Sequence, residues 1–399
     1  AFCHGLGHEA LVYNVALRLA SRLGLTLVHV PLLSHKAHGD HAELRGKAAA
    51  AEAMLGLGGA PAAVTWQALK AARKSGSPID FHELSRPCPE GNSKWLGKGA
   101  AEWRRVEAAV AAAPRSGRPT VFRLCGDVDV KGMDGEEDAK YAFARTGGWW
   151  RARFAQAGKA SPLAHATPLF AAGGGAGGTG GTLNVAVHVR RGDMVYRNFV
   201  KQLVPDAYYA NVMLQLLRLL APQQPAGGGG GPVVRPAVVF HVFTELPPAS
   251  SWTGRSKLPP LPDHARYVDE FGCAADLDAA LRRMLNASVS SEARLERPTN
   301  HEASDAAVAW EVRVHSRVDA LASILHMASA DVLVASDSSF SLLAAVLSRG
   351  LVLSMRSWKR FPESARRGLR FPLTTEPDGR FDCAEASQMW NRRRASTRE

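Results

Sequence analysis

The stretch Leu183–Tyr196, LNVAVHVRRGDMVY, joins an apolar run directly to a cluster of charges. Its first part is typical of a buried β-strand, and it ends in Arg190 and Arg191, with Asp193 two residues later. Two adjacent guanidinium groups beside a core are costly unless something anionic uses them. The stretch therefore predicts a buried strand whose carboxyl end carries an anion-binding site.

Short apolar runs separated by helical patterns continue through the second half of the chain. The predicted strands cover residues 184–189, 237–243, 310–314, 331–335 and 351–354, and the predicted helices cover 205–220, 318–328 and about 336–350. This alternation favours an α/β fold with a parallel sheet covered on both faces. Because crossovers are right-handed, we expect the polar residues after these strands to gather on one edge of the sheet.

The first half of the chain shows the same two kinds of pattern. Apolar residues at helical spacing predict an amphipathic helix over Glu9–Leu23, and the run LTLVHV that follows predicts a strand over 25–30. Further predicted elements are helices over 48–55, 63–74 and 100–113 and a strand over 120–125. We therefore expect α/β layers here too.

A chain of 399 residues fits two domains. The segment AAGGGAGGTGG cannot pack a core and is typical of a flexible linker. We expect an N-terminal α/β domain over 1–170, a glycine-rich linker over 171–182, a C-terminal α/β domain over 183–375 and a solvated basic tail over 376–399.

Composition narrows the class of partner. The net charge of +12 favours anionic ligands, but the basic residues are spread along the chain and no aromatic stacking platform accompanies them, so we expect no nucleic-acid partner. No run approaches the ~20 apolar residues of a membrane span, and no signal peptide is visible. Five scattered cysteines without a CxxC pair argue against a zinc ribbon, and the opening AFCHGLGHE suggests a fragment whose first part is missing.

Two more strand ends carry polar residues. Thr244 and Glu245 follow one predicted strand, and the segment SDSSFS, which contains Asp337, Ser338 and Ser339, follows another. SDSSFS leads into a predicted helix, and a helix amino terminus binds anions. Serine as a simple helix N-cap is the alternative, which the paired arginines make less favourable.

HVRRGD resembles the His-x-Arg-Arg-x-Asp motif of the GT-B fucosyltransferase superfamily, which covers α1,2-, α1,6- and protein O-fucosyltransferases. Three other blocks agree in order: CHGLGHEALVYNVALRLASRLGLTLVHV, VVFHVFTE and ADVLVASDSSFSLLAAVLSRG. Together the blocks cover about half of the chain. The resemblance implies two Rossmann-like domains that face a central cleft, and the C-terminal domain binds the nucleotide sugar while the N-terminal domain faces the acceptor.

The activity implied is that of a glycosyltransferase that moves fucose from GDP-fucose, with inversion, to a hydroxyl of a glycan or peptide acceptor. The resemblance implies no cofactor and no obligatory metal. It also implies the Golgi or ER lumen and a membrane anchor absent from this chain, although a cytoplasmic enzyme stays open. A non-catalytic nucleotide-sugar or glycan-binding relative that has lost its base is the alternative.

By the resemblance, Arg190 binds the β-phosphate and stabilises the departing GDP. A fixed guanidinium suits that role because negative charge grows on the diphosphate in the transition state. Arg191 either assists or forms a structural salt bridge with Asp193, and His188 either contacts the nucleotide or is a half-buried strand histidine. Ser338 and Ser339 are expected to hold the β-phosphate from the opposite side. The remaining candidate contacts with the substrate are Thr244, Glu245 and Asp337.

The catalytic base is open. The expected glycine loop contains Gly5 and Gly7, but His8 stands where the family commonly has asparagine. Glu9 next to it could deprotonate the acceptor, or it could be an acidic residue favoured by the dipole of a helix first turn. Asp193 is the rival base, and orienting the arginines is its favoured role.

Overall fold

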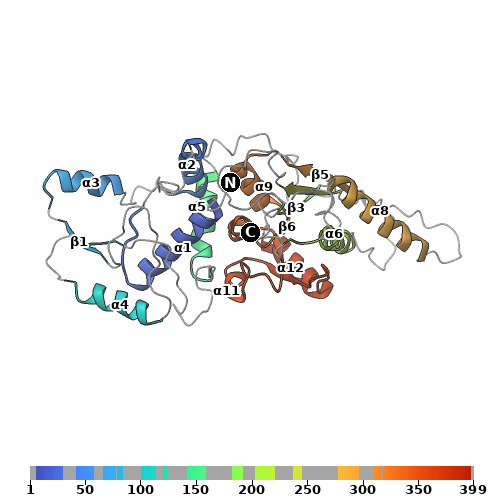
Figure 1. The fold of residues 1–399 in the computed structure, drawn as a ribbon. Helices are drawn as coiled ribbons and strands as arrows, with labels where there is room; N and C mark the ends of the chain where they lie inside the picture. The colour runs from blue at the N-terminus through green and yellow to red at the C-terminus, as the bar shows by residue number, and fades with distance from the viewer. Residues whose placement is uncertain are drawn as a thin grey trace, which may run out of the picture. The chain divides into compact units, whose positions relative to one another are not determined.

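The computed structural model describes residues 6–29, 42–57, 66–77, 79–83, 100–113, 120–123, 142–158, 182–191, 203–220, 237–244, 277–295, 310–316 and 318–396. The chain divides into two compact units. Unit 1 comprises Ala1–Cys3, Ala166–Phe361 and Leu369–Glu399, and unit 2 comprises His4–His165 and Pro362–Gly368. Figure 1 shows the elements of each unit along the chain.

Unit 1 is built on a six-stranded sheet in the order β5-β4-β3-β6-β7-β8, in which every neighbouring pair is parallel. The strands are β3 (Leu183–Val189), β4 (Val238–Thr244), β5 (Trp310–His315), β6 (Val332–Val334), β7 (Leu351–Met355) and β8 (Pro372–Thr375). Numbered within the unit, this order is 3-2-1-4-5-6, that of a doubly wound Rossmann-like sheet. The predicted α/β class with a parallel sheet is confirmed for unit 1.

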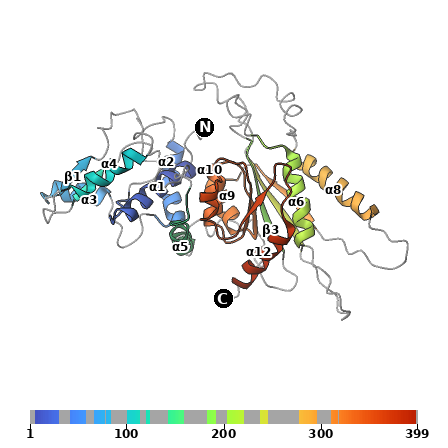
Figure 2. The ribbon, with the colours of Figure 1, turned by 90° about the horizontal axis from the view of Figure 1, so that it is seen from below.

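Helices cover both faces of this sheet. One face carries α6 (Asp206–Leu220), α8 (Leu277–Leu295) and α12 (Cys383–Ser396), and the other carries α9 (Ala320–Ser329) and α10 (Ser339–Leu347). Figure 2 shows α9 and α10 on the opposite side of the strands from α6 and α12. Burial on both faces explains why the centre of β3 has three consecutive apolar residues: Val185, Ala186 and Val187 are all fully buried.

A glycine permits the close approach of β7 to β6. Gly350 stands one residue before β7, and a Cβ there would lie 2.4 Å from the Ala330 carbonyl oxygen and 2.5 Å from that of Asp331. These contacts are too short for any side chain, so only glycine allows the chain to pass here. The resulting register pairs Leu351 with Val332.

A buried ion pair joins α12 to the amino-terminal end of the sheet. Arg393 Nη2 donates to Asp331 Oδ1 at 2.6 Å, and the backbone N–H of Asn184 donates to Asp331 Oδ2 at 2.9 Å. The side chains of Arg393 and Asp331 are 7% and 6% exposed. The segment expected to be a solvated basic tail therefore forms a helix and carries a buried arginine, because Asp331 provides the counter-charge.

Unit 2 is largely helical in its described part. Its helices are α1 (Leu6–Arg22), α2 (Ala42–Leu55), α3 (Trp66–Lys74), α4 (Ala100–Ala111), α5 (Gly147–Gly158) and α11 (Glu363–Arg366). Its strands β1 (Asp80–Glu83) and β2 (Thr120–Arg123) form a two-stranded parallel sheet. Asn14 of α1 joins α5 through its Oδ1, which accepts from Thr146 Oγ1 at 2.5 Å and from Trp150 Nε1 at 3.2 Å.

The segment Pro362–Gly368 belongs to unit 2 although the chain on both sides of it belongs to unit 1. Arg151 Nη1 of α5 donates to the carbonyl of Gly368 at 2.8 Å, which fixes the end of this segment. The C-terminal domain predicted over 183–375 included this segment, whereas the structure assigns it to unit 2. A second Rossmann-like domain and the GT-B arrangement stay predictions.

Most predicted elements of both units occur within a few residues of their expected bounds. The strand predicted over 25–30 is an exception: residues 25–28 have no regular structure, and His29 forms only an isolated bridge. Most of the predicted linker, residues 171–181, lies outside the described residues. In the parts of the chain that the structure describes, no helix combines the length and the apolar character needed to cross a membrane.

Candidate functional site

The candidate site lies where the strand order of the sheet reverses. β3 and β6 are neighbours there, with Val187 paired to Val334, although they are the first and fourth strands of the unit. Arg190 comes directly after β3, and Ser336–Ser338 come after β6. Open α/β sheets bind ligands outside the carboxyl ends of their strands at this switch point. The segments that contain Arg190 and Ser336–Ser338 therefore lie at the same edge of the sheet, as the sequence predicted.

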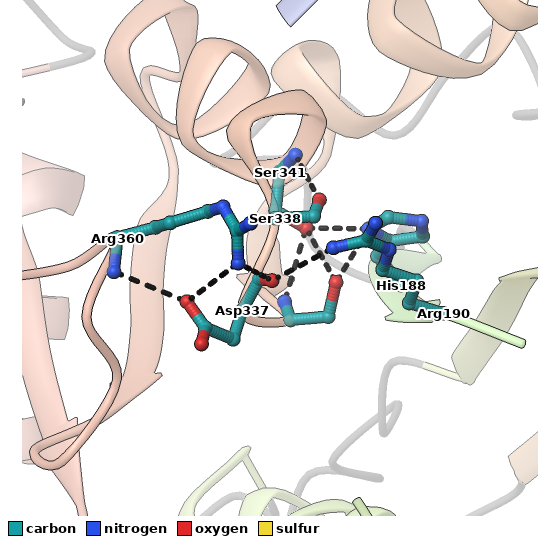
Figure 3. A network of polar contacts seen from close by, with 7 residues as sticks. His188, Arg190, Asp337, Ser338, Ser341 and Arg360 are labelled. Atoms are coloured by element: carbon teal, nitrogen blue, oxygen red, sulfur yellow. Dashed lines mark hydrogen bonds and ion pairs between the residues drawn. The ribbon is translucent and has the colours of Figure 1, made fainter. Parts of the chain in front are cut away.

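A buried cluster of one imidazole and two hydroxyls joins these segments. His188 Nδ1 lies 2.9 Å from Ser336 Oγ and 2.5 Å from Ser341 Oγ, and the two hydroxyls are 3.1 Å apart. Ser341 Oγ also accepts from the backbone N–H of Ser336 at 3.0 Å. Figure 3 shows His188 reaching from the end of β3 to the turn before α10. The cluster fixes the β6–α10 turn against β3.

His188 is only 5% exposed, and its ring packs near Phe340, with 5.4 Å between ring centroids. Burial among protein groups matches the alternative of a strand histidine for its imidazole. A contact of His188 with a nucleotide stays a prediction.

Ser338 is the N-cap of α10. Its Oγ accepts from the backbone N–H of Ser341 at 2.9 Å, and the residue is 4% exposed. The hydroxyl therefore satisfies one of the helix's amino-terminal donors. Ser339 begins the helix and is half-buried. Its expected contact with a phosphate stays a prediction.

Arg190 extends from the end of β3 towards the same turn. Its Nη1 donates to the backbone carbonyl of Asp337 at 3.2 Å. The arginine and the amino end of α10 thus lie on the same side of the switch point, as the prediction of a shared anion site requires. Figure 3 shows this contact.

A second arginine, Arg360, meets Arg190 at the same oxygen. Arg360 Nη1 donates to the carbonyl of Asp337 at 2.9 Å, and its backbone N–H donates to Asp337 Oδ1 at 3.1 Å. The sequence analysis missed Arg360, which lies five residues after the end of β7. Its place beyond a predicted parallel strand was the available indication, since such residues can reach the same edge of the sheet.

Arg191 points to a different partner. Its Nη1 donates to the Val204 carbonyl at 3.0 Å, and its Nη2 contacts Asp206 Oδ1 in the first turn of α6. The side chains of Arg191 and Asp206 are 12% and 0% exposed. A structural salt bridge was one of the two alternatives for Arg191, and among the described residues it forms one with Asp206. Asp193 lies outside the described residues.

Of the remaining candidate site residues, the structure describes some and not others. Thr244 ends β4 beside Val189, and its Oγ1 is buried with no hydrogen-bond partner among the described residues. Gly5 and Glu245 lie outside those residues, as does the side chain of His8.

The expected glycine loop is helical from Leu6 onwards, since Gly7, His8 and Glu9 lie in α1. Glu9 occupies the first turn and is half-buried, as the dipole alternative predicts.

Three histidines form a separate cluster in unit 1. His241 Nδ1 lies 3.1 Å from His315 Nε2, their rings are stacked, and His241 Nε2 lies 3.2 Å from Asn184 Oδ1. Burial, with smaller contributions from His315, Arg313 and His326, lowers the pKa of His241 to about 3. His241 is therefore neutral at physiological pH, which suits a structural group better than an anion contact.

The arrangement at the switch point can hold an anion, since guanidinium groups bind phosphate oxygens in charge-assisted hydrogen bonds. Within the described ranges, no group of three His, Cys, Asp or Glu residues could hold a metal ion. No protein-family model and no curated protein matches this chain. Function is therefore inferred from the site and from the motifs in the sequence.

Proposed function

We propose that the chain is a glycosyltransferase that transfers fucose from GDP-fucose to a hydroxyl of a glycan or protein acceptor, with inversion and without a metal. The observation that carries the proposal is the convergence of Arg190 and the amino end of α10 at the Asp337 main chain, at the switch point of a Rossmann-like sheet. Nucleotides bind at this place in such sheets. The identity of the donor, GDP-fucose, is inferred from the motif HVRRGD and its spacing from SDSSFS.

The proposed reaction is a single displacement. The acceptor oxygen bonds to C1 of fucose, the bond from C1 to the β-phosphate oxygen breaks, and GDP leaves with the electron pair. Charge on that oxygen grows as the bond breaks, so a guanidinium held beside it lowers the barrier. Arg190 is the candidate for this role, because its contact with the Asp337 carbonyl holds its head at the end of β6.

The acceptor proton needs a base. Glu9 and Asp193 are the candidates from the sequence. Glu9 lies in the first turn of α1, in unit 2.

A binding protein without transfer is the second candidate. The observation that favours it is the sequence GLGHE at Gly5–Glu9, in which His8 stands where the family commonly has asparagine. Such a protein keeps the diphosphate site and lacks the base. The proposal of a Golgi or ER-lumen enzyme with a membrane anchor outside this chain depends on the resemblance alone.

A thermal-shift screen with GDP, UDP, GDP-fucose and GDP-mannose tests the donor. A ligand at 100 times its Kd stabilises the folded state by about 2.7 kcal/mol, which raises the melting temperature measurably. We expect GDP and GDP-fucose to raise it more than UDP does. Equal shifts for GDP and UDP contradict the proposed donor. GDP binding without GDP release across a panel of glycan and peptide acceptors favours the binding protein.

A further inference from the structure

Arg360 is the feature of the switch point that the sequence motifs leave unexplained. It lies in the segment between β7 and the point where the chain enters unit 2, and its side chain is 25% exposed. Asp337, whose side chain is 11% exposed, holds it by three contacts. These are the backbone N–H to Oδ1 at 3.1 Å, Nη1 to the carbonyl oxygen at 2.9 Å, and an Nη1–Oδ1 ion pair at 3.6 Å.

The contact that matters is the one shared with Arg190. Two guanidinium nitrogens, one from each arginine, lie within 3.2 Å of the same Asp337 carbonyl oxygen. Figure 3 shows the two side chains approaching Asp337 from opposite sides. Like charges brought to one neutral oxygen repel each other, and this repulsion is relieved when an anion lies between them.

Two other arginines of unit 1, Arg393 and Arg191, are more deeply buried than Arg360. Arg393 and Arg191 each contact a buried carboxylate, Asp331 and Asp206, and those side chains are at most 12% exposed. Arg360 is more exposed than either, and its guanidinium is directed to a main-chain oxygen at the edge where nucleotides bind. Exposure leaves it accessible to a ligand, and the contacts with Asp337 limit the entropy that it loses on binding.

We propose that Arg360 is a second diphosphate-binding residue, which contacts the diphosphate of the donor from the side opposite Arg190. Asp337 is the positioning residue that holds Arg360 in place. This inference rests on the proposed function for the identity of the ligand, a nucleoside diphosphate sugar, but the site itself requires only a diphosphate. The competing interpretation is that Arg360 only fixes the segment after β7 to the β6–α10 turn.

The test is calorimetric titration of the purified chain with inorganic pyrophosphate and, separately, with GDP. Arg360→Ala removes the guanidinium, and Arg360→Gln removes the charge but keeps an amide donor for the Asp337 carbonyl. Arg356→Ala is the matched control, because Arg356 follows β7 in the same segment and its side chain is 71% exposed. The free energy of unfolding of each variant is measured in parallel.

We expect Arg360→Ala and Arg360→Gln to bind pyrophosphate and GDP roughly 10- to 100-fold more weakly than the parent chain, the range for a lost charge-assisted contact. Arg356→Ala is expected to bind both as the parent does. Parental affinity for pyrophosphate in either folded Arg360 variant overturns the inference, even where the unfolding free energy falls.

Failure of the proposed function looks different. A parent chain that binds pyrophosphate but shows equal affinity for GDP and UDP, with both Arg360 variants weakened, keeps the inference and contradicts the GDP-fucose donor. A parent chain that binds neither pyrophosphate nor any nucleoside diphosphate overturns both.

Discussion

Arg190 and Arg191 are neighbours in the sequence, yet the two sides of the end of β3 on which they lie have different properties. On the α6 side, Arg191 contacts the Asp206 carboxylate, which is fully buried. On the α10 side, Arg190 shares the Asp337 carbonyl with Arg360. On the first side a fully buried carboxylate is neutralised by one guanidinium. On the second, two guanidinium groups donate to one neutral carbonyl oxygen, and the Asp337 carboxylate lies 3.6 Å from Arg360 Nη1. The difference indicates that a structural arginine is distinguished from a binding arginine by the group it contacts, and not by its place in a sequence motif.

The amino-terminal end of the sheet repeats the structural pattern. Arg393 of α12 contacts Asp331 directly before β6, and both side chains are less than a tenth exposed. Removing one member of such a buried pair leaves an uncompensated charge, whereas replacing both members by apolar residues is often neutral. The following predictions test the contrast, in order of decreasing expected effect.

Arg191→Ala is expected to have the largest effect on stability. It leaves the fully buried Asp206 carboxylate without its guanidinium, so we expect the free energy of unfolding to fall by about 3–5 kcal/mol. Urea denaturation measures the change. Arg313→Ala is the control: its pair with Glu311 is about half exposed, and we expect a loss of at most about 1 kcal/mol. Equal losses for the two variants contradict a structural role of Arg191.

Arg190→Ala is expected to act on the reaction. The loss of a fixed charge beside the departing diphosphate should lower the rate of fucose transfer roughly 100- to 1,000-fold. We expect the unfolding midpoint to stay near that of the parent, because Arg190 contacts a neutral carbonyl here. Transfer is measured as GDP release under saturating donor. Equal rates of transfer by variant and parent contradict the assignment of Arg190 to the site. A loss of stability as large as that of Arg191→Ala contradicts the proposed difference between the two arginines.

His241 gives a smaller, pH-dependent effect next to the same strand. It is buried against Asn184 and His315, with Arg313, His326 and Glu311 as the other charged or titratable neighbours, and burial lowers its pKa to about 3. The unfolded chain binds this proton near pH 6.5, so the stability present above pH 6.5 is lost as the pH falls towards 3.

Each pH unit in that window costs about 1.4 kcal/mol for one such group, so the loss at pH 5 is about 2 kcal/mol. His241→Gln cannot titrate, and its unfolding free energy should therefore fall less between pH 7 and pH 5 than that of the parent. Urea denaturation at the two pH values makes the comparison. Identical pH dependence in the two proteins shows that His241 does not carry the effect.

Five of the six described strands of unit 1 were predictable because they contain short apolar runs, whereas β8, with the sequence PLTT, was not predicted. The edge on which Arg190 and SDSSFS lie was also predictable, since parallel strands present their carboxyl ends together. The helix over Cys383–Ser396 was not predicted, because its run of arginines is typical of a solvated tail. Burial of Arg393 there depends on the counter-charge of Asp331, which the local sequence does not indicate.

By itself, the sequence determined five of the six described strands of unit 1 (all but β8), their shared edge, and the presence of an arginine pair after the first of them. These properties depend on local apolar patterning and on chain order. Only the tertiary structure decided that Arg191 pairs with Asp206 and that Arg360 joins Arg190 at Asp337. Ion pairs and shared acceptors depend on which side chains folding brings within hydrogen-bond reach. These partners are 15 or more positions apart, and no local sequence pattern indicates that they meet.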